Sequence, residues 1–541
     1  MNVDRLIKEK SLSELLAESR EKYCDRPAAG DAMRALTYEE LGAEVDSFSV
    51  QLMRVGIKQG DTVAFMTNPT VEFLVAYLAV LQVGAIWLGL NPAYKRQELA
   101  HILADATPDL LLFHQELADS NVDELTAAVA ETECEKPQRF DIFHGREVGL
   151  SEVVLSQHDV VELQVRRSQL QVDVPGALFY TSGTTGKPKG ALAHQAALAR
   201  IALVQSKRWG LSTPRVLCNL PVNHTGCVGD IVGPAQYVGG YLFFMESFDV
   251  PATINAIQQV RLNALVQIPT QIIGLMNHDG FENVARGNLR LVAWGGAALP
   301  ASYVTALRDW GIRMTTVYGS SETIASLTCS RESASVKELA NSVGAPDPEF
   351  QMRIAESPDR VLDFNEAEGA TGEVYVKHWT FLPGYLNRRD ATRETFTDDG
   401  WLKTGDIGRV TREGNLQLVG RTSEMFKSGG YNIYPQEIED ALETAPEVAQ
   451  AVVTSVPDDK FSEVGFAFVV LMRALKSSDH VTADSLIQYC KNNLARYKAP
   501  KFVEVVEKLP TLPTGKIDKK SLKRRAKELA EDRKVAGGRN V

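Results

Sequence analysis

Residues 180–190 concentrate hydroxyl, glycine and lysine residues in one short segment, Tyr180-Thr181-Ser182-Gly183-Thr184-Thr185-Gly186-Lys187-Pro188-Lys189-Gly190. Glycine lets the backbone turn several N–H groups toward one anion, and the hydroxyl and ammonium groups supply further donors. The spacing is not that of a Walker-type loop, because only two residues separate Gly183 from Gly186 and proline follows Lys187. The segment is therefore predicted to wrap a polyphosphate at the end of a buried strand over residues 176–179.

Five further segments place polar side chains beside glycine or proline, as a site with fixed donors and close backbone approach requires. In chain order they are Tyr318-Gly319-Ser320-Ser321-Glu322-Thr323, Trp401-Leu402-Lys403-Thr404-Gly405-Asp406, Gly420-Arg421 with the stretch from Gly429 to Glu439, the stretch from Leu494 to Lys501, and Pro513-Thr514-Gly515-Lys516. With residues 180–190, this ordered set resembles the motifs of the AMP-forming adenylate family. That family includes acyl- and aryl-CoA synthetases, nonribosomal-peptide adenylation domains and firefly luciferase.

The resemblance implies a site in which a carboxylate is joined to the α-phosphate of ATP. Because this reaction brings anions together, the site must supply positive charge, a metal and fixed donors. Glu322 is expected to bind Mg²⁺, a hard ion that carboxylate and phosphate oxygens coordinate. Asp406 is expected to accept the ribose hydroxyls, and Tyr318 to stack on adenine. The resemblance assigns the whole set of ATP and AMP contacts to Thr181, Ser182, Gly183, Thr184, Thr185, Gly186, Lys187, Lys189, Gly296, Ala297, Ala298, Tyr318, Gly319, Ser321, Asp406 and Arg421.

The catalytic residues implied by the resemblance are Lys516, Glu322 and His224. Lys516 would offset charge on the carboxylate and α-phosphate in the adenylating state. His224 would lie beside the acyl carboxylate. The residues expected to bind the acyl group are His224, Gln267, Thr270, Trp294, Gly295, Val317 and Ser320. They are mostly apolar or neutral, and no arginine is placed to pair a second carboxylate. A monocarboxylic acid is therefore expected, of short or medium chain, alicyclic or aromatic, with Trp294 shortening the pocket.

Coenzyme A is the expected second substrate, because family members transfer the acyl group to a thiol after the C-terminal domain swings about a hinge. Ser428, Gly429 and Gly430 would leave room for the thiol arm, as a glycine-rich strand does in the family. Ser423 stands at the hinge, where the family usually has Asp or Lys. The resemblance implies an N-terminal adenylate-forming domain over residues 1–420, a hinge over 421–424 and a mobile C-terminal domain over 425–541.

The elements that must position these residues alternate between helical and strand patterns, which is typical of α/β layering. Thr37 and Glu40 predict a capping box at a helix start, and residues 61–66 and 291–295 read as strands. The apolar run over residues 73–90 is interpreted as a buried helix followed by a strand rather than a membrane span. The fold class is thus α/β: a large N-terminal domain of layered α/β subdomains with a β-rich subdomain, and a small mobile α+β C-terminal domain.

Composition limits the classes of function. The chain has 541 residues, more than one hydrophobic core usually serves, with 44% hydrophobic and 23% charged residues. A net charge of −11 disfavours general nucleic-acid binding. Six scattered cysteines without a CxxC pair argue against a zinc site or disulfide framework and fit a reducing cytoplasm. The expected partners are the carboxylic acid, ATP and CoA, with no nucleic acid and no membrane span; a homodimer is one alternative for the oligomeric state.

Three activities remain as hypotheses at this level. The first is a carboxylic acid–CoA ligase that forms AMP and pyrophosphate. The second is a free-standing adenylation enzyme that loads the phosphopantetheine thiol of a carrier protein. The third is a luciferase-like oxidation, which light emission with oxygen would reveal. Thioester formation with free CoA, rather than with a carrier protein alone, separates the first two.

Overall fold

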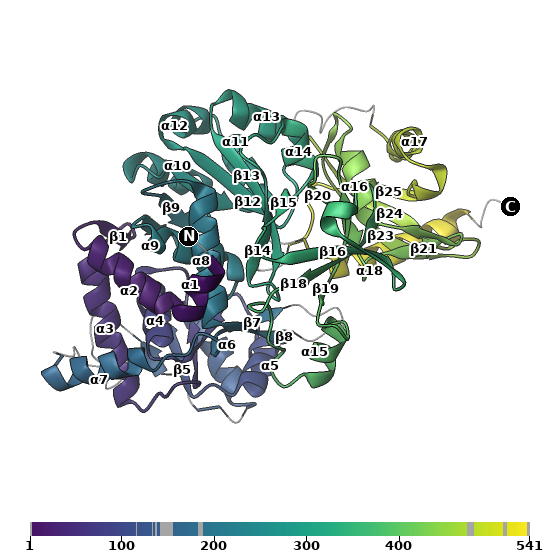
Figure 1. Cartoon of the computed structure of the whole chain (residues 1–541). Coiled ribbons are helices and arrows are strands. Elements are labelled where there is room, and N and C mark those ends of the chain that lie inside the picture. The colour runs from purple at the N-terminus through teal and green to yellow at the C-terminus, as the bar shows by residue number, and fades with distance from the viewer. Residues whose placement is uncertain are drawn as a thin grey trace. The chain divides into compact units, whose positions relative to one another are not determined.

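The computed structural model describes residues 3–114, 116–132, 134–135, 138–140, 155–181, 188–472, 481–511 and 517–537. The chain forms two compact units (Figure 1). The first comprises Met1–Met352, Val376–Thr404 and Glu413–Leu416; the second comprises Arg353–Tyr375, Gly405–Arg412 and Gln417–Val541.

Two sheets form the frame of the first unit. The nine-stranded sheet has the order β15-β14-β13-β12-β11-β9-β10-β1-β2, and its strands from β9 to β13 pair in parallel. Their bounds are β1 Pro27–Gly30, β2 Ala35–Thr37, β9 Arg215–Cys218, β10 Tyr241–Phe244, β11 Ala264–Gln267, β12 Leu291–Gly295, β13 Arg313–Ser320, β14 Ala325–Cys329 and β15 Ala345–Pro346. The six-stranded sheet has the order β6-β5-β3-β4-β7-β8, with β3 Thr62–Met66, β4 Ile86–Leu90, β5 Leu110–His114, β6 Gln138–Phe140, β7 Pro175–Thr181 and β8 Lys189–His194.

Helices cover the faces of these sheets in layers. One core joins both sheets to helices between them, including α3 (Tyr38–Arg54), α4 (Val71–Gln82) and α8 (Gln195–Trp209). A second core packs the other face of the nine-stranded sheet against α10 (Val250–Gln259), α11 (Pro269–Met276), α12 (Phe281–Asn288) and α13 (Ala301–Asp309), as Figure 1 shows. A third packs the six-stranded sheet against α5 (Arg96–Ala106) and α6 (Asp119–Val129). The remaining elements of this unit are α1 Val3–Glu9, α2 Leu12–Lys22, α7 Gln157–Ser168, η1 Gly226–Val232, α9 Gly233–Tyr237, α14 Val336–Asn341 and α15 Arg389–Thr395.

The second unit is built from antiparallel strands and three longer helices. One sheet has the order β17-β16-β18-β19-β20, and the other has the order β22-β21-β24-β23, with β25 pairing in parallel to β24. The bounds are β16 Gln351–Ser357, β17 Arg360–Asp363, η2 Phe364–Glu366, β18 Thr371–Lys377, β19 Leu402–Val410, β20 Leu416–Arg421, β21 Phe426–Ser428, β22 Tyr431–Ile433, α16 Pro435–Glu443, β23 Val448–Asp458, β24 Ser462–Leu471, α17 Ala483–Asn493, η4 Arg496–Lys498, β25 Phe502–Val505 and α18 Lys519–Gly537.

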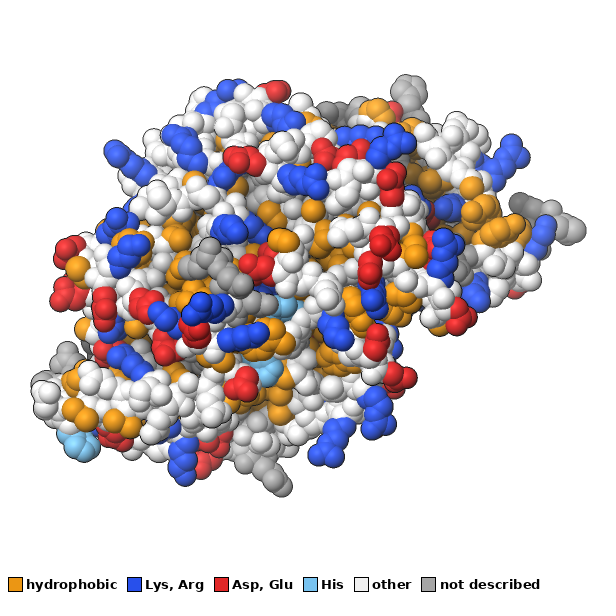
Figure 2. Space-filling model, viewed as in Figure 1, with side chains coloured by type: hydrophobic (Ala, Val, Ile, Leu, Met, Phe, Trp, Pro, Cys, Tyr) orange, Lys and Arg blue, Asp and Glu red, His pale blue; other side chains and the backbone are white. Residues whose placement is uncertain are grey.

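Local sequence signals explain several element boundaries. Thr37 and Glu40 form the predicted capping box at the start of α3. The apolar run over residues 73–90 is the buried helix α4 followed by β4, as predicted, although the helix N-cap is Thr70. No helix among the described residues is long and apolar enough to cross a membrane. Figure 2 shows Lys, Arg, Asp and Glu side chains scattered over the face of the molecule that it draws.

Candidate active site

The ends of the predicted phosphate-binding loop lie side by side on paired strands. β7 and β8 are antiparallel, with Thr181 opposite Lys189 in register. Both residues are half-buried, at the end of the strand pair where the loop connects β7 to β8. The loop itself, residues 182–187, lies outside the described residues. It consists of Ser182, Gly183, Thr184, Thr185, Gly186 and Lys187.

Helix α5 holds both stems of this loop. The His101 Nε2 donates a hydrogen bond of 2.8 Å to the carbonyl oxygen of Pro188, directly after the loop. One turn further along the same helix face, Asp105 accepts a 2.9 Å hydrogen bond from the Tyr180 hydroxyl, directly before the loop. Arg388 pairs with the other oxygen of Asp105 at 3.1 Å. Arg388 and Tyr180 together fix the direction of the Asp105 carboxylate. Helix α5 thus contacts the chain on both sides of the loop.

Glu322 follows β13 and is held by a segment from much later in the chain. The Tyr385 hydroxyl donates a 2.7 Å hydrogen bond to Oε1 of Glu322. The backbone N–H of Leu382 donates to the Glu322 carbonyl oxygen at 2.8 Å. The Lys189 ammonium lies 5.2 Å from the centre of the Tyr385 ring, within the range of a cation–π contact. Tyr385 thus joins residues of two predicted motifs.

The donor set around Glu322 fits Mg²⁺. Glu322 and Ser321 are both half-buried and offer a carboxylate and a hydroxyl oxygen, the ligand type that this ion prefers. Among the described residues there is no group of three or more His, Cys, Asp or Glu side chains that could hold a metal. An ion bound by one carboxylate with water and substrate phosphates needs no such group.

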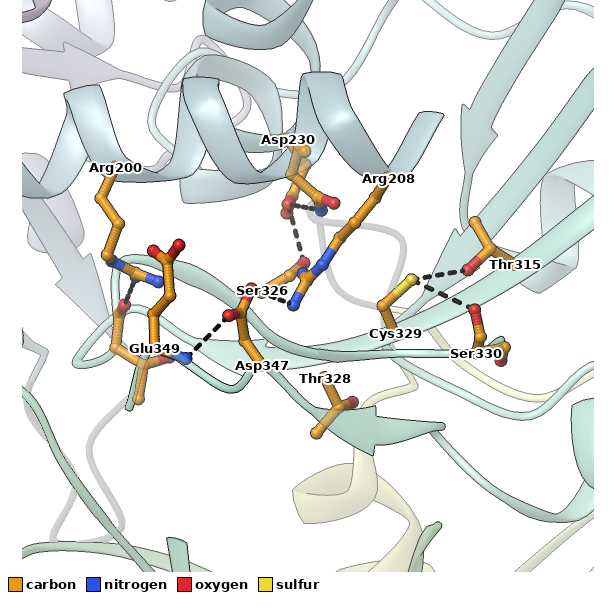
Figure 3. Close-up of polar contacts among 12 residues, drawn as sticks. Arg200, Arg208, Asp230, Thr315, Ser326, Thr328, Cys329, Ser330, Asp347 and Glu349 are labelled. Carbon is orange, nitrogen blue, oxygen red and sulfur yellow. Dashed lines mark hydrogen bonds and ion pairs between the residues drawn. The ribbon is translucent and has the colours of Figure 1, made fainter. Parts of the chain in front are cut away.

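A buried polar cluster lies beneath the loop that carries Glu322 (Figure 3). From α8, Arg200 donates a 3.0 Å hydrogen bond to the carbonyl oxygen of Thr323. Asp230 accepts hydrogen bonds from Ser326 at 2.7 Å and from Gln205 at 2.6 Å. Burial lowers the pKa of Arg200 to about 10 and raises the pKa of Asp230. These bonds fix the loop from below.

The close approach of β14 to β13 explains why the motif over residues 318–323 has glycine at position 319. A side-chain carbon at Gly319 would lie 2.0 Å from the carbonyl oxygen of Ala325. Ile324 and Ala325 themselves have positive φ angles of 52° and 70°, an uncommon conformation for residues with side chains. The loop is therefore strongly constrained, as binding sites often are.

Several residues predicted to bind nucleotide or acyl group lie at the carboxyl ends of parallel strands. Gln267 is opposite Trp294, and Gly295 is opposite Val317, on β11, β12 and β13. This edge is where open α/β sheets bind ligands. The other members of the set are placed nearby in sequence: Thr270 is exposed at the start of α11, Gly296, Ala297 and Ala298 are exposed after β12, Tyr318 is buried, Gly319 is exposed and Ser320 is half-buried.

Trp294 faces the core between the nine-stranded sheet and helices α10 to α13. It shares that core with Val292, while Leu291 and Ala293 belong to the core on the opposite face. The indole is completely buried, and its N–H has no hydrogen-bond partner among the described residues. The structure therefore places Trp294 in the core, and its role in the acyl pocket stays a prediction.

His224 lies in the turn before η1. Its Nδ1 accepts a 3.0 Å hydrogen bond from the backbone N–H of Gly226, so the neutral ring carries its proton on Nε2. The preceding Asn223 donates to the Tyr94 hydroxyl at 2.6 Å, and burial raises the pKa of Tyr94 to about 12. Sequence analysis had not identified Tyr94. A polar side chain within a turn before a helix is the only sequence signal it carries.

In the second unit, Asp406 and Arg421 form an ion pair. Arg421 Nε lies 2.9 Å from Oδ1 of Asp406, whose side chain is only 6% exposed while that of Arg421 is 59% exposed. The preceding Gly405 has a φ of 73°, and its carbonyl oxygen accepts hydrogen bonds from the backbone and side chain of Thr422. The predicted hinge residue Ser423 is exposed and lies within this unit, so the hinge at residues 421–424 stays a prediction.

Gly429 and Gly430 form the turn of a β-hairpin instead of part of a strand. Ser428 on β21 pairs with Tyr431 on β22, which leaves the two glycines as a two-residue connection. Their φ angles are 56° and 88°, the left-handed values that such a turn requires. A side-chain carbon at Gly430 would meet nothing within 4 Å. The glycine-rich strand expected from the resemblance is thus corrected to an open turn.

Lys516 lies outside the described residues, but the structure describes both sides of it. Thr511 and Ile517 form an antiparallel bridge across the gap. Lys519, at the start of α18, lies 2.7 Å from Glu424 and 3.7 Å from the buried Glu439. The segment that follows Lys516 is therefore anchored to the predicted hinge.

The strand pair β7–β8, whose connecting sequence is rich in hydroxyl and lysine residues, and the link from Lys189 through Tyr385 to Glu322 are features expected of a nucleotide-binding enzyme. Comparison with known proteins gives the family. The AMP-binding enzyme model matches residues 16–386, and the AMP-binding enzyme C-terminal domain model matches residues 437–516. The indoleacetate–CoA ligase of Aromatoleum aromaticum is 30% identical over 487 residues, which cover 90% of this chain and 92% of that protein.

A second sequence relative and a solved structure support the same family. The feruloyl-CoA synthase of an Amycolatopsis species is 31% identical over 492 residues, covering 91% of this chain and 94% of that protein. The crystal structure of ATP-bound MatB from Rhodopseudomonas palustris has a TM-score of 0.79 at 26% identity, covering 96% and 99%. The chain therefore belongs to the AMP-binding enzyme family. This confirms the resemblance to AMP-forming adenylate enzymes and the predicted fold class.

Proposed function

We propose that this protein is an AMP-forming carboxylic acid–CoA ligase, which converts an acid, ATP and CoA into an acyl-CoA, AMP and pyrophosphate. The observation that carries the proposal is the connection between the two phosphate-side motifs. Lys189 from one motif and Glu322 from the other are held by the same tyrosine. The match of both family models along the chain, with CoA ligases among its relatives, supports the same activity.

In the first half-reaction, the chain's own groups bind and orient the nucleotide. The hydroxyl, glycine and lysine groups of the loop from Thr181 to Lys189 would hold the β- and γ-phosphates. When bound, Mg²⁺ would neutralise phosphate charge, and Glu322 with Ser321 would hold it. The buried Asp406, with its side chain fixed by Arg421, would accept the ribose hydroxyls. Tyr318, Gly296, Ala297 and Ala298 would contact the base.

Lys516 and His224 would act on the reacting carboxylate. The Lys516 ammonium offsets the charge that develops as the carboxylate attacks the α-phosphorus and pyrophosphate leaves. His224, whose Nδ1 accepts from the Gly226 N–H, would present Nε2 to the acyl carboxylate. Gln267, Thr270, Gly295, Val317 and Ser320 would line that site.

In the second half-reaction, the thiol of CoA attacks the acyl carbonyl and AMP leaves. The Gly429–Gly430 turn, without side chains, would let the narrow thiol arm pass. We propose that a hinge at Ser423 exchanges the two states of the domain from residue 425 onward. Residues 1–420 would then form the adenylate-forming domain.

The acid is proposed to be a monocarboxylate with an aromatic, alicyclic or short- to medium-chain body. The proposed acyl site contains neutral side chains and no arginine, which disfavours a second carboxylate. An aromatic acid is favoured within this class, since the relatives act on indoleacetate and produce feruloyl-CoA.

A panel of acids tests this function. The purified protein is given each acid with ATP and magnesium, and exchange of labelled pyrophosphate into ATP is measured, followed by AMP release with and without CoA. CoA-dependent AMP release with at least one monocarboxylate is expected. Exchange without CoA-dependent release, together with loading of a phosphopantetheine carrier protein, would favour the free-standing adenylation enzyme. No exchange with any acid would contradict both.

A further inference from the structure

Tyr385 is the residue in which the phosphate-side contacts converge, although no motif of the sequence contains it. It lies just before α15, about 60 residues beyond Glu322 and almost 200 beyond Lys189 in sequence. Its ring contacts the Lys189 ammonium at 5.2 Å and its hydroxyl donates to Glu322 at 2.7 Å. The two contacts use different parts of one side chain, so the hydroxyl contact can be removed while the ring contact is kept.

The backbone of Tyr385 is fixed at several points. Its N–H donates to the Thr392 hydroxyl at 2.9 Å. Tyr385 forms an antiparallel bridge with Ala191 on β8, and the next N–H, of Leu386, donates to the Gly190 carbonyl oxygen at 2.8 Å. The tyrosine is thus attached to the strand that leaves the phosphate-binding loop. It holds its place relative to that strand independently of the Glu322 contact.

The Tyr385 hydroxyl donates to one oxygen of the Glu322 carboxylate, Oε1, at 2.7 Å. A neutral hydroxyl donating to a carboxylate orients one carboxylate oxygen and leaves the other available to a cation. Without this bond, Glu322 would be free to rotate about its side-chain torsions, at an entropic cost whenever a cation binds.

We propose that Tyr385 is a positioning residue that aims the Glu322 carboxylate at the nucleotide-bound metal and holds the Lys189 ammonium beside the phosphate-binding loop. The proposal rests on the proposed function for the identity of the ligand, MgATP. It assigns the two parts of the side chain separately: the hydroxyl serves the metal-dependent part of nucleotide binding, and the ring serves the metal-independent part.

Calorimetric titration with MgATP, and with ATP in EDTA, tests this division without using catalysis. The ratio of the two dissociation constants measures the metal-dependent part of binding. For Tyr385→Phe, which keeps the ring, MgATP binding is expected to weaken about 5- to 10-fold, the loss of one charge-assisted hydrogen bond, while metal-free binding is unchanged. For Tyr385→Leu, metal-free binding is expected to weaken as well, because Lys189 loses the ring.

Tyr38→Phe is the matched control, since it also removes a buried tyrosine hydroxyl, one that donates to the Gly240 carbonyl oxygen at 2.8 Å and belongs to no predicted site. It is expected to leave the ratio of the two dissociation constants at the wild-type value. An unchanged ratio in Tyr385→Phe, or the same change in both variants, would overturn the proposal. Thermal unfolding of each variant reports folding. Failure of every acid to react would count against the proposed function only, because these titrations contain neither acid nor CoA.

Discussion

Two glycine-containing connections of this molecule are supported in opposite ways. The phosphate-binding loop is held at its stems by residues of α5 and by the segment before α15, which pairs with Gly190 and Ala191. The Gly429–Gly430 turn is closed by its own hairpin, and its second glycine has open space around the missing side chain. The stems of the first connection thus depend on contacts from distant parts of the chain, whereas the second depends on its own backbone pairing.

The largest effect is expected from Lys516→Ala, which tests whether the second unit serves one half-reaction at a time. Loss of the ammonium should lower acid-dependent pyrophosphate exchange by about 100-fold or more, as removal of a charge-stabilising donor does. Thioester formation from presynthesised acyl-AMP should stay within a few-fold of wild type. Lys520→Ala, on the exposed side of α18, is the control. Equal collapse of both steps would refute the division of labour.

Gly430→Val is expected to have the reverse effect. A β-branched residue at a φ of 88° costs about 1–3 kcal/mol and fills the turn, so the CoA step should slow about 10-fold or more while pyrophosphate exchange persists. Gly369→Val provides the comparison, because Gly369 has a φ of 76°, equally open surroundings and no proposed contact with CoA. If both variants lose the CoA step equally, strain rather than thiol access explains the loss.

Asp105→Asn examines the support of the phosphate-binding loop. The amide keeps the shape of the side chain but loses the charge that holds Arg388 and Tyr180, and such bonds contribute about 1.5–3 kcal/mol. The KM for ATP should rise about 3- to 10-fold with little change in the KM for CoA. Asp109→Asn, which loses the charge on an exposed acceptor for the Thr62 N–H, should change neither constant. A rise in both KM values for Asp105→Asn would show a general loss of structure.

The smallest effect on activity is expected from Glu443 in the second unit, where the quantity that changes is the pH dependence of the free energy of unfolding. Burial raises the pKa of Glu443 from its ordinary 4.5 to about 7. Between these values the folded protein holds a proton that the unfolded chain releases, so the contribution of this group to the free energy of unfolding is present below pH 4.5 and falls as the pH rises through about 7. Glu443→Gln removes this loss, so its stability relative to wild type should increase by about 2–3 kcal/mol from pH 5 to pH 8. Melting curves at both pH values measure it.

Glu528→Gln, on an exposed position of α18, is the control for this experiment. Its stability relative to wild type should be the same at both pH values. The same slope in the two variants would show that the effect comes from net charge and not from the buried environment of Glu443.

The sequence predicted elements whose signals are local. The capping box of Thr37 and Glu40, the buried helix before β4 and the strand before the phosphate-binding loop all appear where their patterns indicate. Two consecutive glycines between short strands, at Gly429 and Gly430, are also a local hairpin signal, which the expectation of a glycine-rich strand did not take into account. Local geometry is thus recoverable because it depends on neighbours in sequence.

The supporting residues could not be predicted, because their function depends on partners far away in the chain. His101, Asp105 and Tyr385 belong to no motif, and their types are ordinary for a helix and a loop. The sequence also does not show on which face of the sheet Trp294 lies. The run Leu291-Val292-Ala293-Trp294 is apolar at every position and is buried on both sides of the sheet. Only the packed structure shows which face each side chain takes.

The contacts of Asp105 have a consequence for the order of folding. This one residue bonds Tyr180, 75 positions away, and its carbonyl oxygen accepts from Asn387, 282 positions away. Contacts across such spans carry a high loop-closure cost and form late. During synthesis the contacts of Asp105 with Asn387 and Arg388 are therefore absent until the ribosome has released the chain beyond residue 388, and a fragment that ends earlier contains every residue of the loop but only part of the support for its stems.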